Sequence, residues 1–584
     1  MIRCIKADTV AALFLLLPAL FFASCDDTAG PTDNQSSGYT YEDEFFDPER
    51  VTEVRIEIDQ DDWDELRVQR KTFIDVFGVY CTAVAPSPYQ YYPAAVTIDG
   101  ETVENVGVRK KGFFGSQSEI RPSLKIDFSE YDGDLRFHGI KRLTLNNNRQ
   151  DLSRIKQCLC YELMDRAGLP APRCSFVHVF VNGTDLGIYS NVEPIKKPFL
   201  RRHFSDDSGN LYEGQITDFR DDPMWLGRLE KESNEEEDDW SDVLAVVAAL
   251  EEPDDTLLAE LEKIVDVDAF YHHWAMEILT GHWDGYVQNT NNFYFYNDPG
   301  PGKFYFIPWG TDGTFSSRVP EQFGSWSVMA KCALAHRLYE HPEGREAYIA
   351  VLRNLIDTMW DTDEITGRID EMHDLVVPYI SGLELPLFEA VTDDVKKFIT
   401  DVKTNVLAET ADGPPEWNEP LQDPICLIEK GEVSATFFTT WGTIGWPNPF
   451  LTGTCTLDMD VEGIGGTPQL RGAMAGTQYN PENPLSLFMA IIMNIVLMED
   501  GTVYGMAINF PITELYSGNE IVIDFPNSNA ALVKMVQGSQ EAEILGILMS
   551  GTLKLDIASP IPGSIIMGSI TGPLWNFVAG WPGQ

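Results

Sequence analysis

The sequence contains few basic side chains. Lysine and arginine number 42 against 91 aspartates and glutamates, which gives the 584 residues a formal net charge of −49. A surface that binds nucleic acid needs a basic patch, and a face that adsorbs to anionic lipid needs a polybasic one. We therefore expect no nucleic-acid partner. With 43% hydrophobic and 11% aromatic residues, the chain still has the apolar material for packed cores.

Long apolar runs are also missing after the first residues. The longest, 485–498, is shorter than the roughly 20 residues of a membrane-spanning helix, and we interpret it as a buried helix. Residues 1–24 combine a short basic start with an apolar stretch, which is typical of a signal peptide. Small residues precede Cys25, so this segment resembles a bacterial lipoprotein signal whose cysteine is lipidated. An ordinary secretory signal is the alternative.

The lipoprotein interpretation predicts where the protein works. Residues 25–44 are rich in Asp, Thr, Gly, Pro, Asn and Ser, and we expect them to form a flexible tether. The protein then belongs to the cell envelope, on the periplasmic side or at the cell surface. Its only contact with the membrane is the lipid anchor.

Cysteine is scarce, with nine residues in the whole chain. One is lost with the signal peptide and Cys25 is lipidated, which leaves an odd number and at least one thiol unpaired within the chain. Cys426 and Cys455 flank a strand-rich segment, and we predict a disulfide between them. Cys158 and Cys160 lack the spacing of a redox or zinc motif, so no metal–thiolate site is expected.

The hydrophobic pattern divides the remaining chain into two parts. From residue 45 to 410, strand-like segments come first and helical ones follow, which predicts an α+β domain. The character changes near Gly413. Residues 424–584 consist of short β-prone runs between Gly and Pro turns, which predicts an all-β, sandwich-like domain.

Several short pieces in the first part occur in the order found in protein kinases. His282-Trp283-Asp284 is followed five residues later by Asn289, and kinases use an H-R-D-x-x-x-x-N loop. Asp312 comes directly after a predicted hairpin, where kinases place a metal-binding aspartate. Phosphoryl transfer needs these types of residue, because it depends on positioning and on charge neutralisation by lysine and carboxylate-held Mg²⁺. Polar residues in such loops also serve as simple turn formers.

A longer set of stretches identifies a family. The stretches are 106–112, 121–128, 143–148, 151–153, 181–189, 209–213, 283–286, 291–296 and 306–315. In sequence and in order they resemble the CotH kinase family, which is named for a spore-coat protein and shares a divergent protein-kinase-like fold. The resemblance implies a two-lobed, atypical kinase-like domain that uses ATP with Mg²⁺ or Mn²⁺.

The resemblance also implies roles in catalysis and metal binding. Asp284 corresponds to the catalytic-loop aspartate and Asp312 to the metal-binding aspartate. Two candidates stay open for the metal-side asparagine. Asn292 fits the family pattern, and Asn289 has the protein-kinase spacing.

Four further residues are candidates for nucleotide binding. Lys125 corresponds to the strand lysine that contacts the phosphates, and Arg109 adds positive charge near it. Glu193 lies where the chain passes between the lobes, so it is a hinge candidate. Glu162 is a candidate helix partner of Lys125, and an exposed helix glutamate is the alternative.

One position departs from the family pattern. The family has Asp-x-Asp after its Pro-Trp or Tyr, whereas here Gly310 replaces the first aspartate and Asp312 remains. Two functions therefore stay in view. One is an exported protein kinase that phosphorylates Ser or Thr of envelope or surface proteins. The other is a catalytically inactive kinase-fold surface lipoprotein that acts as a binding or adhesion module.

Overall fold

The computed structural model describes residues 44–316, 324–477, 489–525, 527–536 and 542–578, which divide into two compact units. The larger unit contains the described residues up to Lys71 together with Thr82–Gln422. The β unit contains Thr72–Cys81 and the described residues from Asp423 on. The division predicted from the sequence left 72–81 with the first part of the chain. The signal peptide, Cys25 and nearly all of the tether lie outside the described residues.

A closed barrel begins the larger unit, with its strands in the order β1-β2-β3-β4-β5-β7-β6. The strands are β1 (Val51–Ile58), β2 (Tyr92–Ile98), β3 (Glu101–Lys111), β4 (Ser123–Asp127), β5 (Arg142–Asn146), β6 (Cys174–Val181) and β7 (Thr184–Val192). Val108 of β3 and Leu124 of β4 belong to the barrel core. Because side chains alternate along a strand, Arg109, Lys111 and Lys125 lie on the opposite face, with Arg109 and Lys125 in register.

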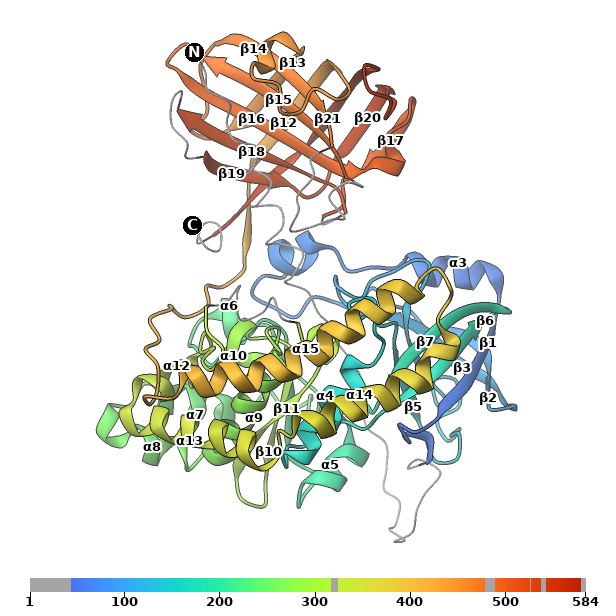
Figure 1. Ribbon diagram of the computed structural model, residues 1–584, viewed down its shortest axis with the longest axis vertical. Helices are drawn as coiled ribbons and strands as arrows, with labels where there is room; N and C mark the ends of the chain where they lie inside the picture. Colours follow the sequence, from blue (N-terminus) through green and yellow to red (C-terminus); the bar gives the residue numbers. More distant parts are fainter. Residues whose placement is uncertain (1–43, 317–323, 478–488, 526, 537–541, 579–584) are drawn as a thin grey trace. The chain divides into compact units, whose positions relative to one another are not determined.

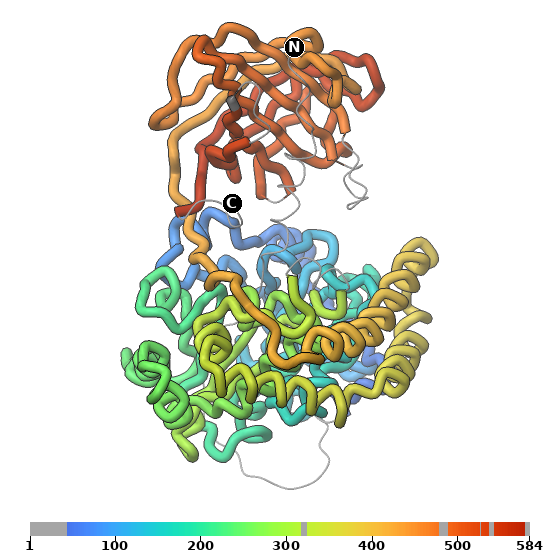
Figure 2. Tube along the Cα trace, turned by 60° about the vertical axis from the view of Figure 1, so that its left-hand side comes forward, coloured from blue at the N-terminus to red at the C-terminus, as the bar shows by residue number. Residues whose placement is uncertain are grey.

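A small sheet and a set of helices complete the larger unit. The sheet order is β11-β10-β8-β9, with β8 (Asn210–Gly214), β9 (Leu229–Lys231), β10 (Phe293–Asp298) and β11 (Lys303–Pro308). The helices are α3 (Gln60–Val68), α4 (Lys156–Arg166), α5 (Lys197–His203), α6 (Pro223–Leu226), α7 (Ser241–Leu250), α8 (Asp254–Leu261), α9 (Val267–Thr280), α10 (Tyr286–Asn289), α12 (Ala333–Glu340), α13 (Pro342–Thr358), α14 (Thr362–Val376) and α15 (Leu385–Glu409). The last two lie side by side in Figures 1 and 2.

Helix α9 leads into the candidate catalytic loop, and its ends are marked by the sequence. Asp266 caps the N-terminus by accepting a hydrogen bond from the backbone N–H of Ala269 at 3.0 Å. Gly281 ends the helix in the left-handed conformation, with φ of 61°. Trp274 of α9 stacks on Tyr348 of α13 with ring centroids 3.7 Å apart, so the helix is held firmly in the core.

The described part of the β unit contains one ten-stranded sheet, the π-helix Asp75–Val79 and short 3-10 turns between strands. The strands are β12 (Leu427–Thr440), β13 (Gly453–Val461), β14 (Pro468–Gly476), β15 (Met489–Met498), β16 (Thr502–Pro511), β17 (Asn519–Val522), β18 (Asn529–Val536), β19 (Ala542–Leu548), β20 (Thr552–Ile557) and β21 (Ile565–Phe577). The helix expected over 485–498 is wrong for its described part. Residues 489–498 pair on both sides, with β14 and β16, which is why an apolar run here forms a buried strand. Within the described part of the chain, no helix has the length and apolar character needed to cross a bilayer.

Two disulfides are present among the described residues, Cys81–Cys426 and Cys158–Cys174. The predicted Cys426–Cys455 pair is therefore wrong. Cys81 reaches Cys426 because the segment 72–81 packs into the β unit, where the rings of Phe73 and Phe525 lie 4.9 Å apart. Cys455 is buried as a free thiol in the core of the β unit.

Candidate functional site

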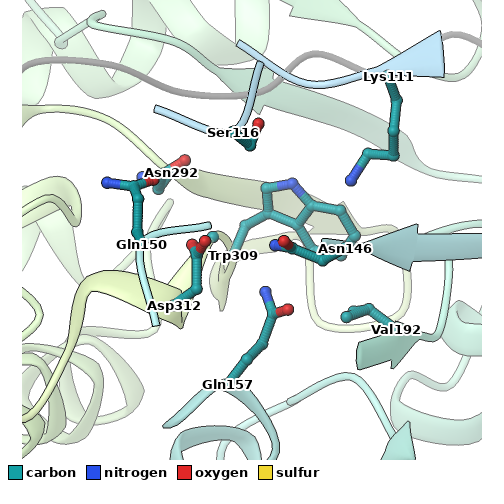
Figure 3. A pocket seen from close by; sticks show the side chains of 10 residues that line it. Lys111, Ser116, Asn146, Gln150, Gln157, Val192, Asn292, Trp309 and Asp312 are labelled. Atoms are coloured by element: carbon teal, nitrogen blue, oxygen red, sulfur yellow. The ribbon is translucent and has the colours of Figure 1, made fainter. Parts of the chain in front are cut away.

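A pocket lies in the larger unit, between the outer face of the barrel, helix α4 and the turn after β11. Figure 3 shows the side chains that surround it. Its lining residues are Lys111, Ser116, Asn146, Gln150, Gln157, Val192, Asn292, Trp309, Gly310 and Asp312. Three of the strands that contribute, β3, β5 and β7, belong to the barrel, so the pocket joins the barrel to the end of the small sheet.

Asp312 provides the carboxylate of the pocket. It lies on the 3-10 turn η2 (Thr311–Gly313), which the left-handed Gly310 introduces directly after Trp309. The side chain is 4% exposed, and its Oδ2 has no hydrogen-bond partner among the described residues. Burial raises the pKa of Asp312 to about 6, although the positive charge of Lys111 acts in the opposite direction. A buried oxygen without a partner that faces a pocket is available to a ligand.

Asp284 lies next to this pocket and is held by three asparagines. Its Oδ1 accepts hydrogen bonds from Asn289 Nδ2 at 2.6 Å and from Asn291 Nδ2 at 3.4 Å. Its Oδ2 accepts one from Asn292 Nδ2 at 2.5 Å. Burial raises the pKa of Asp284 well above its usual range, against the effect of the Asn289 and Asn291 hydrogen bonds, and the charge of Asp312 raises it further. The structure thus brings together the four residues predicted for catalysis and metal binding.

Glu277 of α9 positions the loop that carries Asp284, and the sequence analysis missed it. Its carboxylate accepts hydrogen bonds from the backbone N–H of Tyr286 at 3.0 Å and of Val287 at 2.9 Å. His273 Nε2 lies 2.9 Å from Glu277 Oε1. Despite complete burial, the charge and hydrogen bond of His273 hold the pKa of Glu277 below its usual range. The i, i+4 spacing of a histidine and a glutamate just before the loop was the available sequence feature.

The predicted nucleotide-binding residues do not line the pocket. Arg109 and Lys125 are buried, 3% and 1% exposed, and face each other across β3 and β4. Lys111, two residues further along the same face of β3, lines the pocket, with its Nζ 5.9 Å from the centre of the Trp309 ring. The period of two along a strand was the feature that pointed from Arg109 to Lys111.

Lys125 is instead close to a buried acidic group. Glu213, Glu230 and Glu232 offer carboxylate oxygens that lie within 4.8 Å of one another. Lys196 Nζ lies 2.5 Å from Glu232 Oε2. Burial raises the pKa of Glu232, and the charges of Lys196 and Lys125 lower it. The two lysines thus bring positive charge next to Glu232, but burial has the larger effect on its pKa.

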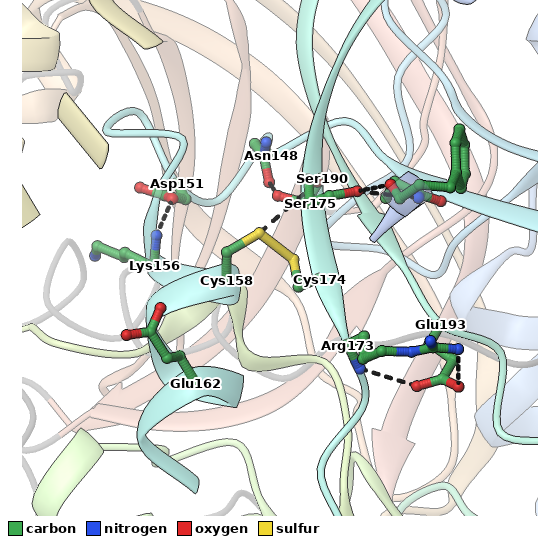
Figure 4. Close-up of a disulfide and its surroundings, with 12 residues drawn as sticks. Asn148, Asp151, Lys156, Cys158, Glu162, Arg173, Cys174, Ser175, Ser190 and Glu193 are labelled. Carbon is green, nitrogen blue, oxygen red and sulfur yellow. Dashed lines mark hydrogen bonds and ion pairs between the residues drawn. A yellow bond between two sulfur atoms is a disulfide. The ribbon is translucent and has the colours of Figure 1, made fainter. Parts of the chain in front are cut away.

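The two predicted glutamates are engaged by arginines. Glu162 accepts a hydrogen bond from Arg368 Nε at 3.0 Å, so the predicted pairing of Glu162 with Lys125 is wrong. Glu193, directly after β7, accepts from Arg173 at 2.9 Å and also pairs with Arg202. Figure 4 shows Glu162 on α4 and the bonds between Arg173 and Glu193. Both carboxylates thus serve ion pairs away from the pocket lining.

The oxygens of the pocket fit a divalent cation of the hard type. Asp312 offers the unpartnered Oδ2, and Asn292 offers Oδ1, because its Nδ2 is used by Asp284. Mg²⁺ and Mn²⁺ prefer such ligands, and Mg²⁺ keeps several waters and binds through one or two carboxylates plus substrate phosphates. No carboxylate comes from position 310. A Cβ placed on Gly310 would lie closer than 3.0 Å to Asn292 Oδ1.

Comparisons with known proteins point to one family. Residues 108–383 match the family model described as CotH kinase protein. The chain is similar to inner spore coat protein H of Bacillus subtilis (strain 168), with 23% identity over 258 residues that cover 42% of this chain and 70% of that protein. It is also similar to invasin CotH2 of Rhizopus delemar, with 23% identity over 259 residues, 40% of this chain and 44% of the invasin. The chain thus spans less than half of the length of that invasin.

The crystal structure of a Helicobacter pylori proinflammatory kinase, CtkA, is among the solved structures that align with the chain. The alignment covers 49% of this chain and 92% of that chain, with a TM-score of 0.27 and 11% identity. The range of the family match, 108–383, contains Lys111, Asp284, Asn292 and Asp312. Through residues 108–383, the chain is therefore similar to the CotH kinase family.

Proposed function

We propose that the pocket binds ATP with Mg²⁺ or Mn²⁺ and that the domain transfers the γ-phosphoryl group to Ser or Thr hydroxyls of envelope or surface proteins. The observation that carries the proposal is that Lys111 and Asp312 line one pocket. A lysine for the phosphates opposite a buried carboxylate for the cation is the combination that phosphoryl transfer needs. The protein carries a net charge of −49, so a pocket that binds phosphates needs basic side chains of its own to make the local potential positive.

Each residue of the pocket has a task in this proposal. Lys111 Nζ binds phosphate oxygens, and the buried Arg109 and Lys125 add positive potential behind it. Asp312 and Asn292 hold the cation, which supplies charge neutralisation to the phosphates when bound. Trp309 covers one side of the pocket and excludes water.

Asp284 is the proton acceptor in the proposed reaction. The substrate hydroxyl oxygen attacks the γ-phosphorus, the bond from phosphorus to the bridging β,γ-oxygen breaks, and ADP leaves. The hydroxyl proton passes to Asp284. Its raised pKa makes Asp284 a stronger base than an ordinary carboxylate, and the three asparagines fix its orientation.

Labelled ATP tests this proposal. We would incubate the mature chain with γ-labelled ATP and Mn²⁺ or Mg²⁺ and measure label on the chain itself and on acceptor proteins such as casein. Transfer is expected for the wild type and for Glu162→Gln, whose side chain pairs with Arg368 outside the pocket lining. Asp312→Asn should lower the rate at least a hundredfold. Equal rates in Asp312→Asn and wild type would refute the proposal.

A second function is favoured by one observation, the engagement of Asp284 by three amides together with glycine at position 310. In that case the domain is a binding module that holds nucleotide or a partner without transfer. Nucleotide with Mn²⁺ would then raise the melting temperature of the wild type while no label reaches any hydroxyl.

We also propose that the protein is an exported lipoprotein anchored through Cys25. The two disulfides among the described residues support an oxidising compartment, because cytosolic proteins rarely keep such bonds. Growth with labelled palmitate should label the wild type but not Cys25→Ser. Label on Cys25→Ser, or none on the wild type, would contradict the anchor.

A further inference from the structure

Four buried side-chain oxygens around the pocket have no hydrogen bond of normal geometry among the described residues. They are Gln157 Oε1, Tyr161 Oη, Thr311 Oγ1 and Asp312 Oδ2. All four residues are nearly inaccessible, at 3%, 1%, 0% and 4% exposed. Leaving a buried polar atom without a partner costs about 1–3 kcal/mol, so such groups are normally explained by water or an ion.

The four oxygens come from two elements that pack against each other, α4 and η2. Gln157 and Tyr161 are four residues apart on α4 and therefore share one face of the helix. Thr311 and Asp312 are neighbours in η2. Burial raises the pKa of Tyr161, and side-chain hydrogen bonding to Thr311 and Gln157 lowers it, which places these three side chains together. Figure 3 shows Gln157 and Asp312 directed into the same space.

The first turn of α4, which contains Gln157, is restrained at two neighbouring residues. Asp151 Oδ2 accepts a hydrogen bond from the backbone N–H of Lys156 at 2.8 Å, and the next residue after Gln157 forms the Cys158–Cys174 disulfide to β6. Figure 4 shows both restraints. The position of the Gln157 side chain is therefore set by the fold before any ligand arrives.

The chemistry of the four groups points to one class of ligand. A carboxylate, an amide carbonyl and two hydroxyls are hard oxygen donors, which suit Mg²⁺ or Mn²⁺ and not the softer metals. Gly310 contributes no oxygen from its side chain, and Asn292 donates its amide to Asp284. Asn292 still offers its Oδ1, and a further protein ligand on the α4 side would strengthen a site built on Asp312 and Asn292.

We propose that Gln157 and Asp312 together bind a divalent cation between α4 and η2, with Gln157 Oε1 supplying a protein ligand that glycine at position 310 does not. The hydroxyls of Thr311 and Tyr161 form hydrogen bonds with the water molecules that complete the coordination of the cation. The use of this cation in catalysis rests on the proposed function, but its binding needs no nucleotide. The cation also links α4 to the turn that carries Asp312. Because the Cys158–Cys174 disulfide joins α4 to β6, the barrel is linked to this turn as well.

The test is binding of MnCl₂ alone to the nucleotide-free chain, followed by electron paramagnetic resonance of free Mn²⁺. Gln157→Ala should weaken binding at least tenfold and Asp312→Asn should weaken it at least as much. Gln157→Glu places a carboxylate at the same position and should bind at least as tightly as the wild type. Glu162→Gln, on the same helix, should bind like the wild type. Wild-type affinity in Gln157→Ala, or no Mn²⁺ bound by the wild type, would overturn the proposal.

The phosphotransfer assay separates this inference from the proposed function. If Mn²⁺ binding depends on Gln157 but the chain transfers no phosphate, the cation site is supported and the kinase activity is refuted. If transfer depends on Mn²⁺ but neither Gln157 variant changes the affinity for Mn²⁺, the kinase activity is supported and the cation site is refuted. Melting temperatures without metal identify any variant that fails to fold, and the gain expected for Gln157→Glu cannot arise from misfolding.

Discussion

Asn292 Nδ2 donates a hydrogen bond to Asp284 Oδ2 at 2.5 Å, and it also donates to the backbone carbonyl of Asp284 at 3.2 Å. The other end of the same amide faces Gly310, where a Cβ would approach Asn292 Oδ1 closer than 3.0 Å. The orientation of the catalytic-loop aspartate is thus coupled to the absence of a side chain at position 310. A side chain there would displace Asn292 and remove one of the three amides that hold the Asp284 carboxylate.

Substitution of Gly310 tests this coupling. Gly310→Ala should lower the free energy of unfolding by about 1–2 kcal/mol for the left-handed backbone, with φ of 57°, and by a further amount for the displaced amide. Gly302→Ala is the matched control, because its φ is 70° and nothing lies within 4 Å of its Cβ position. Urea unfolding of both variants measures the difference. Equal losses would show that Asn292 moves aside without cost.

Lys111 should matter more for nucleotide affinity than Lys125. Lys111→Met removes the lysine that lines the pocket, so we expect ATP to bind about tenfold or more weakly in calorimetry with Mn²⁺ present, about 1.4 kcal/mol per factor of ten. Lys125→Met should change ATP affinity less, because Lys125 interacts with the buried Glu232. Loss of ATP binding in Lys125→Met with full binding in Lys111→Met would restore the assignment made from the sequence.

The Cys158–Cys174 disulfide should stabilise the larger unit. It joins residues 16 apart in the sequence, and closing a loop of that size contributes about 3 kcal/mol in the chain-entropy account. The double variant Cys158→Ser with Cys174→Ser should lose roughly this much in guanidinium unfolding. Because α4 carries Gln157, Mn²⁺ should also bind more weakly. A loss well below 1 kcal/mol would mean that packing alone holds α4 in place.

Lys110 should make stability depend on pH in the alkaline range. Its Nζ is buried and donates to the backbone carbonyl of Arg67 at 2.6 Å, and burial lowers the pKa of Lys110 from 10.5 to about 8. The folded protein gives up this proton before the unfolded chain does. Stability therefore rises between about pH 8 and 10.5 relative to a chain without this amine.

Urea midpoints from pH 7 to 10 check the effect of Lys110. Lys110→Met should remove the relative rise. Lys554→Met is the control, because Lys554 lies on the exposed face of β20 and pairs with Glu520 at 3.1 Å. Parallel profiles for wild type and Lys110→Met would show that the folded protein keeps this ammonium charged.

The order of the site residues was predictable because one hairpin brings them together. Phe293 pairs with Pro308 across β10 and β11, so Asn292 before the hairpin and Trp309 after it become neighbours. The backbone N–H of Trp309 donates to Asn292 O at 3.1 Å. A hairpin that is visible in the sequence therefore fixes the distance between the asparagine loop and Asp312.

The pocket wall was not predictable in the same way. The period of two puts Arg109 and Lys111 on one face of β3, but which of Arg109, Lys111 and Lys125 lines the pocket depends on barrel closure, which no local pattern contains. Gln157 is an ordinary helix residue until η2 packs against α4. The partner of Cys426 is Cys81, 345 residues away in sequence, on the segment 72–81 that belongs to the β unit. Closeness in sequence therefore pointed to Cys455, the wrong cysteine.

Mass spectrometry of the full chain after incubation with ATP and Mn²⁺ tests the central claim most directly. The account predicts phosphorylated Ser or Thr, on the chain or on an added acceptor protein, with the wild type and with Glu162→Gln. It predicts none above background with Asp284→Asn or Asp312→Asn at matched melting temperatures. If the wild type binds ATP in calorimetry but no Ser or Thr becomes phosphorylated under the same conditions, the account is contradicted. The domain would then be a binding module.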